Sequence, residues 1–205
     1  MAIVKVENLT VIYLGKDGQQ YPALTDFSCI FDENCIIGIL GESGSGKTTL
    51  FKSICNLLHY DGQIFFDGVR TTDIKPKDRN LSYFTQEMFM FEHMIVYDIL
   101  AYSLKREKIK PQDIDKMIKE ISSDFGITAL LTRKPKQLSA GQKQLVLMAK
   151  SLIKKPAICC LDEPFSNLDV ISKNTIIKYL IEYMKNNKTT IFITSHNFDD
   201  ISKIC

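Results

Sequence analysis

Apolar and polar residues alternate along much of the first 31 positions of the chain. A period of two is typical of antiparallel strands that bury one face, and it predicts strands at 3–9, 10–14 and 24–31. The Gly-Lys-Asp-Gly sequence at 15–18 provides a turn before the third of them. A further short strand is expected within 62–68, where an Asp67-Gly68 turn closes it.

Three other runs are apolar throughout, which is the pattern of strands buried on both faces of a parallel sheet. They lie at 35–40, 157–161 and 189–194, and a shorter strand is expected at 81–85. Segments with helical spacing lie between them, and we expect helices at 49–55, 142–153 and 172–186. This alternation predicts an α/β fold in which helices cover both faces of a parallel sheet.

Residues 95–131 are also expected to be helical, with a helix start near Pro111 and a solvated charged run at 105–108. Because the composition changes near residue 87, we expect one domain with an insertion. Residues 1–86 and 143–205 would form the core with the antiparallel strands, and residues 87–142 a helical subdomain.

The composition is ordinary for a globular protein. Of 205 residues, 45% are hydrophobic and 24% are charged, and the net charge of +2 gives no reason to expect a nucleic-acid partner. There is no apolar run of ~18 residues and no signal-peptide pattern, so we expect a cytoplasmic chain. The six cysteines form no Cys-x-x-Cys pair, which favours buried reduced thiols over disulfides or a zinc site.

The clearest motif is a glycine-rich loop between the strand at 35–40 and the helix at 49–55. The loop has the pattern Gly-x-x-x-x-Gly-Lys-[Ser/Thr] and consists of Gly41, Glu42, Ser43, Gly44, Ser45, Gly46, Lys47, Thr48 and Thr49. Such a loop binds nucleotide phosphates, because its backbone N–H groups can approach the phosphate oxygens. Lys47 is expected to reach the β- and γ-phosphates, and the Thr48 hydroxyl to bind Mg²⁺.

Two further motifs have both a chemical and a structural interpretation. The strand at 157–161 ends in Asp162, which suits Mg²⁺, and Glu163, which could polarise a water molecule. A strand-end aspartate can also cap the following turn. Ser139 and Gln142 match a capping box at a helix start, and a capped helix N-terminus is also an anion site.

The order of these motifs resembles that of the ATP-binding-cassette (ABC) ATPases over nearly the whole chain. The family's Walker A, Q-loop, signature, Walker B, D-loop and H-loop match, in order, the glycine-rich loop, Gln86, residues 138–142, residues 161–164, residues 166–169 and His196. The resemblance implies a P-loop NTPase core with a parallel sheet, an N-terminal antiparallel β subdomain and an inserted α-helical subdomain that ends in the signature motif.

The resemblance also implies roles for single residues. Lys47, Glu163 and His196 would be catalytic, and His196 would contact the γ-phosphate. Tyr13 would stack on adenine, although an ordinary strand residue is the alternative. The Mg²⁺ ligands would be Thr48, Gln86 and Asp162.

In this family two domains pair head to tail with ATP between them. A second ABC ATPase subunit, identical or not, would therefore complete each site with Ser139, Ala140, Gly141, Gln142 and Asp169. Ala140 replaces the usual first glycine of the signature motif, and we expect function to be retained. The sequence ends at Cys205, where relatives usually continue, so no regulatory C-terminal domain is expected.

Three uses of the ATPase compete: a subunit of a membrane transporter, a non-transport ATP-driven machine, and a slow regulatory switch. We favour the first, because the chain has neither a second cassette nor a long coiled-coil insertion. Residues 87–94, rich in Met and Phe, lie where the family builds a groove for a helix of a separate permease subunit, although core packing is an equal alternative. The chain would then sit on the inner face of the cell membrane. Cargo and direction stay open.

Overall fold

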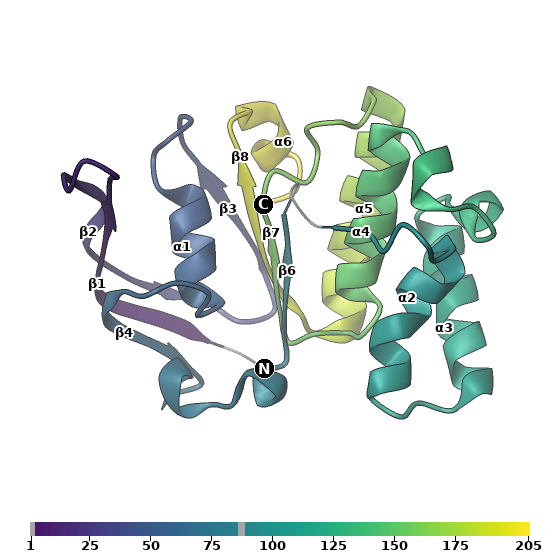
Figure 1. The fold of residues 1–205 in the computed structure, drawn as a ribbon, viewed down its shortest axis with the longest axis horizontal. Coiled ribbons are helices and arrows are strands. Elements are labelled where there is room, and N and C mark those ends of the chain that lie inside the picture. Colours follow the sequence, from purple (N-terminus) through teal and green to yellow (C-terminus); the bar gives the residue numbers. More distant parts are fainter. Residues whose placement is uncertain (1–2, 86–88) are drawn as a thin grey trace.

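The computed structural model describes residues 3–85 and 89–205, in which two four-stranded sheets are surrounded by helices (Figure 1). The antiparallel sheet has the order β2-β1-β4-β5 and the parallel sheet the order β3-β8-β7-β6. The antiparallel strands are β1 (Val4–Leu14), β2 (Gln20–Phe31), β4 (Asp61–Phe66) and β5 (Val69–Arg70). The parallel strands are β3 (Ile36–Leu40), β6 (Leu81–Phe84), β7 (Ile158–Leu161) and β8 (Thr190–Ser195).

Helices pack on both faces of the parallel sheet, as the apolar strands predict. They are α1 (Lys47–Ile54), α2 (Val96–Arg106), α3 (Pro111–Asp124), α4 (Ala140–Leu152), α5 (Val170–Asn187) and α6 (Phe198–Ser202). Short 3-10 helices lie at Thr71–Asp73, Pro76–Asp78, Thr128–Leu130 and Pro135–Gln137. In Figure 1, α1 lies between the two sheets, and α4 and α5 lie on the opposite side of the parallel sheet.

Side chains of β7 and β8 divide between two hydrophobic clusters because successive strand residues point to opposite faces. Cys160 and Phe192 join the cluster that holds α1 and the antiparallel sheet. Leu161 and Ile193 join the cluster formed with α2 to α5. The central strands are therefore buried on both sides, which explains why their sequence shows no alternation.

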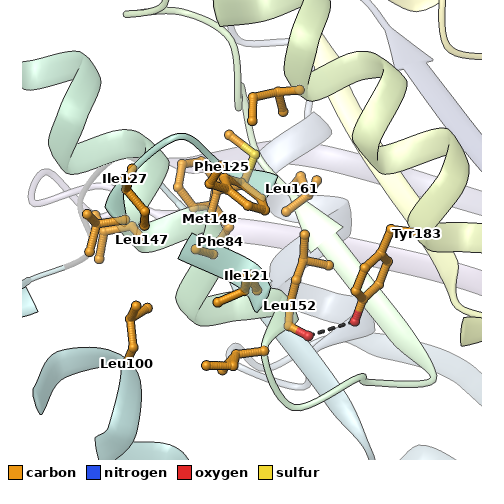
Figure 2. Close-up of a cluster of buried hydrophobic side chains, with 14 of the residues drawn as sticks. Phe84, Leu100, Ile121, Phe125, Ile127, Leu147, Met148, Leu152, Leu161 and Tyr183 are labelled. Carbon is orange, nitrogen blue, oxygen red and sulfur yellow. Dashed lines mark hydrogen bonds between the residues drawn. The ribbon is translucent and has the colours of Figure 1, made fainter. Parts of the chain in front are cut away.

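The larger cluster continues from the sheet into α2 and α3 (Figure 2). Phe84 of β6, Leu100 of α2 and Ile121 of α3 are all buried in it together with residues of α4. At its other side Tyr183 donates a hydrogen bond of 2.6 Å to the backbone oxygen of Leu152. The helices α2 and α3 therefore share one hydrophobic core with the parallel sheet. The expected division into a core and a helical subdomain at 87–142 stays a prediction.

The antiparallel strands differ from their predicted bounds. The two strands expected at 3–9 and 10–14 are one strand, β1, which begins at Val4 and whose register against β2 shifts three times between Val6 and Ile12. Asn8 has a φ of 50°, which is the left-handed conformation typical of an irregular strand position. The prediction of two strands was wrong because such an irregularity interrupts the alternation without ending the strand. The Asp67-Gly68 turn is confirmed, since both residues have positive φ between β4 and β5.

Within the described residues, no helix is long and apolar enough to cross a membrane. All six cysteines are free thiols. The prediction of burial is right for Cys55, Cys159 and Cys160 and wrong for the exposed Cys205, while the other two are partly buried. Burial raises the pKa of the Cys159 thiol to about 12, which makes it unreactive near neutral pH.

Candidate functional site

The carboxyl ends of β3, β7 and β8 meet at one edge of the parallel sheet. β3 leads into the glycine-rich loop, β7 into Asp162 and Glu163, and β8 into His196. The register sets Leu161 opposite Ile193, so these strands end side by side. A cavity of about 640 Å³ opens at this edge between residues 43–49 and the acidic pair, which is where ligands of open α/β sheets bind.

Glycines let the loop pass close to its neighbours before it enters α1. Gly44 and Gly46 have φ of 82° and 91°, a region that favours glycine. A Cβ on Gly46 would lie 2.6 Å from the backbone oxygen of Ala23, closer than real contacts allow. Gly46 is the N-cap of α1, so the loop ends at a helix N-terminus whose N–H groups face the cavity region.

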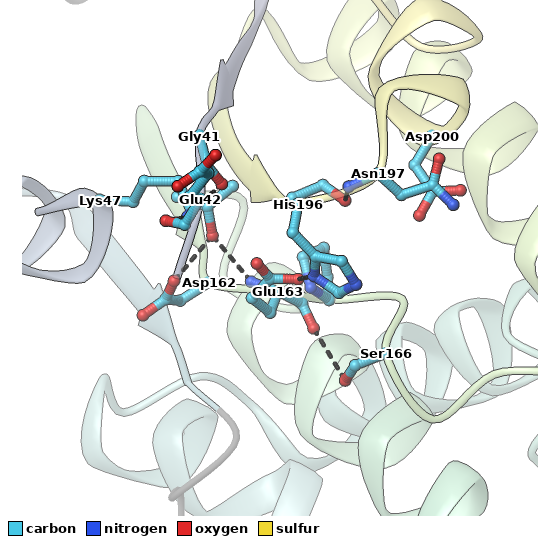
Figure 3. Close-up of polar contacts among 12 residues, drawn as sticks. Gly41, Glu42, Lys47, Asp162, Glu163, Ser166, His196, Asn197 and Asp200 are labelled. Atoms are coloured by element: carbon cyan, nitrogen blue, oxygen red, sulfur yellow. Dashed lines mark hydrogen bonds and ion pairs between the residues drawn. The ribbon is translucent and has the colours of Figure 1, made fainter. Parts of the chain in front are cut away.

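Lys47 lies along the glycine-rich loop (Figure 3). Its Nζ donates hydrogen bonds of 2.7 Å to the oxygen of Gly41 and 2.8 Å to the oxygen of Glu42. Because both partners are neutral carbonyls, the ammonium charge has no acidic counter-ion in these contacts. The Lys47 ammonium group is therefore held against the predicted phosphate-binding loop.

Asp162 is a nearly buried carboxylate that receives three hydroxyl hydrogen bonds. Its Oδ2 accepts from Thr48 Oγ1 at 2.8 Å and from the Tyr83 hydroxyl at 3.2 Å. Its Oδ1 accepts from Thr194 Oγ1 at 2.7 Å. Burial and the charge of Asp162 raise the pKa of Tyr83 well above its usual range, so this phenol remains a donor. The three donors offset the cost of burying the charge.

Glu163 and His196 both line the cavity, and their side chains point toward each other (Figure 3). His196 Nδ1 lies 3.0 Å from Glu163 Oε2. Glu163 has a φ of 50°, a left-handed conformation that costs a non-glycine residue roughly 1–2 kcal/mol. Strained backbone that the surroundings maintain is often found at functional sites. The structure thus brings together two residues that the sequence separates by 33 positions.

Tyr13 lies on the cavity wall beside the phosphate loop. It is partly exposed, and its hydroxyl lies 3.2 Å from Thr49 Oγ1. Tyr21, its cross-strand partner, lines the same cavity. Two aromatic side chains next to a glycine-rich loop give the flat apolar surface on which a nucleobase can stack.

The residues of the signature motif form a capping box at the start of α4. Ser139 Oγ accepts from the backbone N of Gln142 at 3.2 Å, and Gln142 Oε1 accepts from the backbone N of Ser139 at 3.1 Å. The structural interpretation is therefore right, and it leaves the anion interpretation open. None of Ser139, Ala140, Gly141 and Gln142 lines the phosphate-loop cavity.

Gly141 connects the start of α4 to the segment that follows the acidic pair. A Cβ there would lie 2.8 Å from the backbone oxygen of Asn167. Gln144 strengthens the same contact, because its Nε2 donates to the oxygen of Pro164 at 2.6 Å and its Oε1 accepts from the N of Asn167. The start of α4 is consequently in contact with the segment at 164–167.

Asp169 caps α5 through bonds from the backbone N of Ile171 and Ser172. These bonds, with that from the Ser172 hydroxyl, lower the pKa of the carboxyl. Gln86, the remaining predicted Mg²⁺ ligand, lies outside the described residues.

Sequence reasoning missed Thr194, Tyr83 and Gln144. A hydroxyl at the end of an otherwise apolar strand is a signal for Thr194, and nothing comparable marks Gln144.

The site and the fold define a P-loop nucleotide-binding domain. The chain belongs to the ABC transporter family, whose model matches residues 24–166. The molybdate/tungstate import ATP-binding protein WtpC of Pyrococcus abyssi is 42% identical over 163 residues, which are 79% of this chain and 47% of that protein. The oligosaccharides import ATP-binding protein MsmX of Bacillus subtilis is 31% identical over 96% of this chain and 53% of that protein. The chain spans about half the length of the curated relatives it matches.

Solved structures agree with this assignment at the level of the fold. The dimeric structure of MJ0796, a bacterial ABC transporter cassette, has a TM-score of 0.89 at 22% identity and covers 98% of this chain and 90% of its own. The post-hydrolysis state of MJ0796 bound to ADP and Pi has a TM-score of 0.88 at 23% identity. The family resemblance and the predicted α/β P-loop NTPase fold are both confirmed.

Proposed function

We propose that this chain binds and hydrolyses ATP and drives import through a separate membrane-spanning subunit. One observation carries the ATPase part: the phosphate loop, the Asp162–Thr48 contact and the Glu163–His196 pair all lie at one cavity. Phosphoryl transfer to water requires a loop that binds the phosphates, oxygen ligands for Mg²⁺ and a carboxylate that orients the water. The three features supply these in turn.

The donor set at Asp162 fits Mg²⁺. A carboxylate and a hydroxyl 2.8 Å apart are the hard oxygen ligands that this ion prefers, and Gln86 would add a third. When bound, Mg²⁺ would neutralise charge on the β- and γ-phosphates.

The side chains divide the remaining work. When ATP binds, Lys47 Nζ leaves the carbonyl oxygens of Gly41 and Glu42 and donates to oxygens of the β- and γ-phosphates. The N–H groups of the loop and of α1 also bind the phosphates. Tyr13 stacks on the base. Glu163 orients a water molecule and accepts its proton, and His196, which contacts Glu163, keeps that carboxylate in place and reaches the γ-phosphate.

A second copy or a related subunit completes the site. Ser139, Gly141 and Gln142 lie at a helix N-terminus, and no residue of this motif lines the cavity of its own chain. Apolar side chains are also exposed around the catalytic edge: Ile171, which follows Asp169, is 80% exposed, and Phe198, close to His196, is 67% exposed. A second subunit that covered these exposed side chains would gain stability from their burial, which supports the proposal of dimerisation around ATP.

The docking site for the permease is a partly apolar pocket of about 290 Å³ at residues 89–92. Phe84, Met90 and Leu147 line it, and Phe89 at its edge is 93% exposed. An apolar helix face can bind such a surface. Residues 87–142 would then be the subdomain that faces the permease, which would place the chain on the inner face of the cell membrane.

The names of the relatives favour import, since WtpC and MsmX are both import ATP-binding proteins. Their cargoes differ, molybdate or tungstate for one and oligosaccharides for the other. A conserved ATPase with different cargoes indicates that the permease and its partners set the cargo.

The test is capture of partners from the native membrane. Tagged Glu163→Gln chain with Mg-ATP is incubated with detergent-solubilised membranes, and bound proteins are identified by mass spectrometry. We expect a multi-span protein in stoichiometric amount, and we expect its loss when Phe89 is also changed to Ser. Val69→Ser, at an exposed apolar residue of β5 in the antiparallel sheet, serves as the matched control. Recovery of non-membrane partners alone would refute the transporter assignment and favour a non-transport ABC ATPase.

A further inference from the structure

Thr194 is a fully buried residue at the end of β8, and no sequence motif assigns it a role. We propose that Thr194 is a positioning residue for hydrolysis, whose single hydroxyl fixes the relative directions of Asp162 and Glu163. The inference deepens the proposed ATPase function and rests on it.

The hydroxyl connects the two acidic residues directly. Thr194 Oγ1 donates to Asp162 Oδ1 at 2.7 Å and accepts from the backbone N of Glu163 at 2.9 Å. The sheet register makes this possible, because Leu161 of β7 pairs with Ile193 of β8, and Asp162 and Thr194 are the next residue after each. The Thr194 hydroxyl oxygen thus acts as a donor and as an acceptor at the same time.

The bond to Glu163 has a specific effect on the backbone. Glu163 lies in the left-handed region at φ 50°, and such a conformation persists only where the surroundings maintain it. The hydrogen bond from its N–H to Thr194 holds the peptide between Asp162 and Glu163. A rotation of this peptide would carry the Glu163 carboxylate away from His196, with which it now makes a 3.0 Å contact. Small displacements of a reacting group reduce turnover more than binding.

The bond to Asp162 complements the bonds on its other oxygen. Thr48 and Tyr83 both donate to Oδ2, whereas Thr194 donates to Oδ1. The carboxylate plane is therefore held from two sides. If Thr194 only satisfied a buried charge, its loss would lower stability and leave turnover unchanged, which separates a structural role from a positioning role.

The decisive variant is Thr194→Val, which keeps the shape and strand preference of threonine and removes only the hydroxyl. We expect kcat to fall about tenfold or more, because each ~1.4 kcal/mol lost in the transition state costs a factor of ten. The equilibrium Kd for a fluorescent ATP analogue should change less than about threefold, since the loss lies in the transition state. Thr194→Ser, which retains the hydroxyl, should recover most of the wild-type kcat.

Thr190→Val is the matched control. Thr190 lies on the same strand, is fully buried, and accepts a 3.0 Å hydrogen bond from the backbone N of Asn34. The Thr190→Val variant should lower the melting temperature about as much as Thr194→Val and leave kcat unchanged.

Two outcomes refute the inference. The first is a Thr194→Val variant that hydrolyses ATP at the wild-type rate, and the second is a Thr194→Ser variant that is as slow as Thr194→Val. Both leave the ATPase assignment intact. A wild-type chain that binds the analogue and never releases phosphate, alone or with its partner subunits, would instead contradict the proposed function itself.

Discussion

Replacement of Glu163 by glutamine tests the proposed role of this side chain as a proton acceptor. Glutamine has the same length and shape, and its backbone keeps the N–H that bonds Thr194 Oγ1 at 2.9 Å. The amide oxygen or nitrogen can still contact His196, which lies 3.0 Å from the carboxylate. The variant therefore loses a base and keeps the architecture of the site.

The expected magnitude follows from the role of a general base. Such a group contributes about 10²–10⁴-fold to the rate, equivalent to about 3–5 kcal/mol in the barrier. The described hydrogen bonds of the Glu163 side chain involve His196 and none of the phosphate-loop residues. We therefore expect ATP affinity to change less than about threefold while turnover falls by at least about a hundredfold.

The assay combines phosphate release in a single turnover with equilibrium binding of a fluorescent ATP analogue. Glu120→Gln, an exposed substitution in α3, controls for the loss of one negative charge. Retained hydrolysis in Glu163→Gln would show that Glu163 is not the base. A parallel loss of ATP affinity would show that the side chain contributes to binding, which the geometry does not suggest.

Two further predictions concern stability. Gly141→Ala places a Cβ 2.8 Å from the backbone oxygen of Asn167, so we expect the free energy of unfolding, measured in urea, to fall by about 1–3 kcal/mol. The control Ala140→Gly should lower it by at most about 1 kcal/mol. Equal unfolding midpoints for the two variants would contradict the close contact. Burial raises the pKa of Tyr83, Tyr179 and Tyr183. These phenols ionise more easily in the unfolded chain, so the free energy of unfolding should decrease above about pH 10, and Tyr183→Phe should reduce that slope. Stability that stays constant to about pH 11 would refute this assignment.

The fold could be predicted because the strands carry two distinct patterns. Burial on both faces makes β3, β7 and β8 apolar throughout, and each is followed by a motif that needs a strand end. The irregularities of β1 could not be predicted, since they depend on pairing with β2 and β4. The same limit applies to helix starts, which the structure places up to two residues earlier than the periodicity indicates.

The sequence suggests candidate site residues one by one, and their roles stay predictions, but it does not reveal the hydrogen bonds among them. Asp162, Glu163 and His196 are marked by polar chemistry after apolar strands. The sequence marks Thr194 only as a hydroxyl near the end of an apolar strand. Its role depends on the register between β7 and β8, which a single sequence does not reveal. Ser139 shows a different limit, because capping α4 and binding an anion require the same side chain at the same place.

The contact between Thr48 and Asp162 joins residues 114 positions apart, and Glu163 bonds Thr194 a further 31 positions away. During synthesis the phosphate loop leaves the ribosome long before the strands that complete it. Under the proposed function, nucleotide affinity would then belong only to the finished domain. A ligand that binds only the folded state stabilises it by about 2.7 kcal/mol at a hundred times its Kd. ATP in the cell would thus protect completed chains from proteases and leave unfinished chains open to degradation. ATP binding would then favour the accumulation of correctly completed copies.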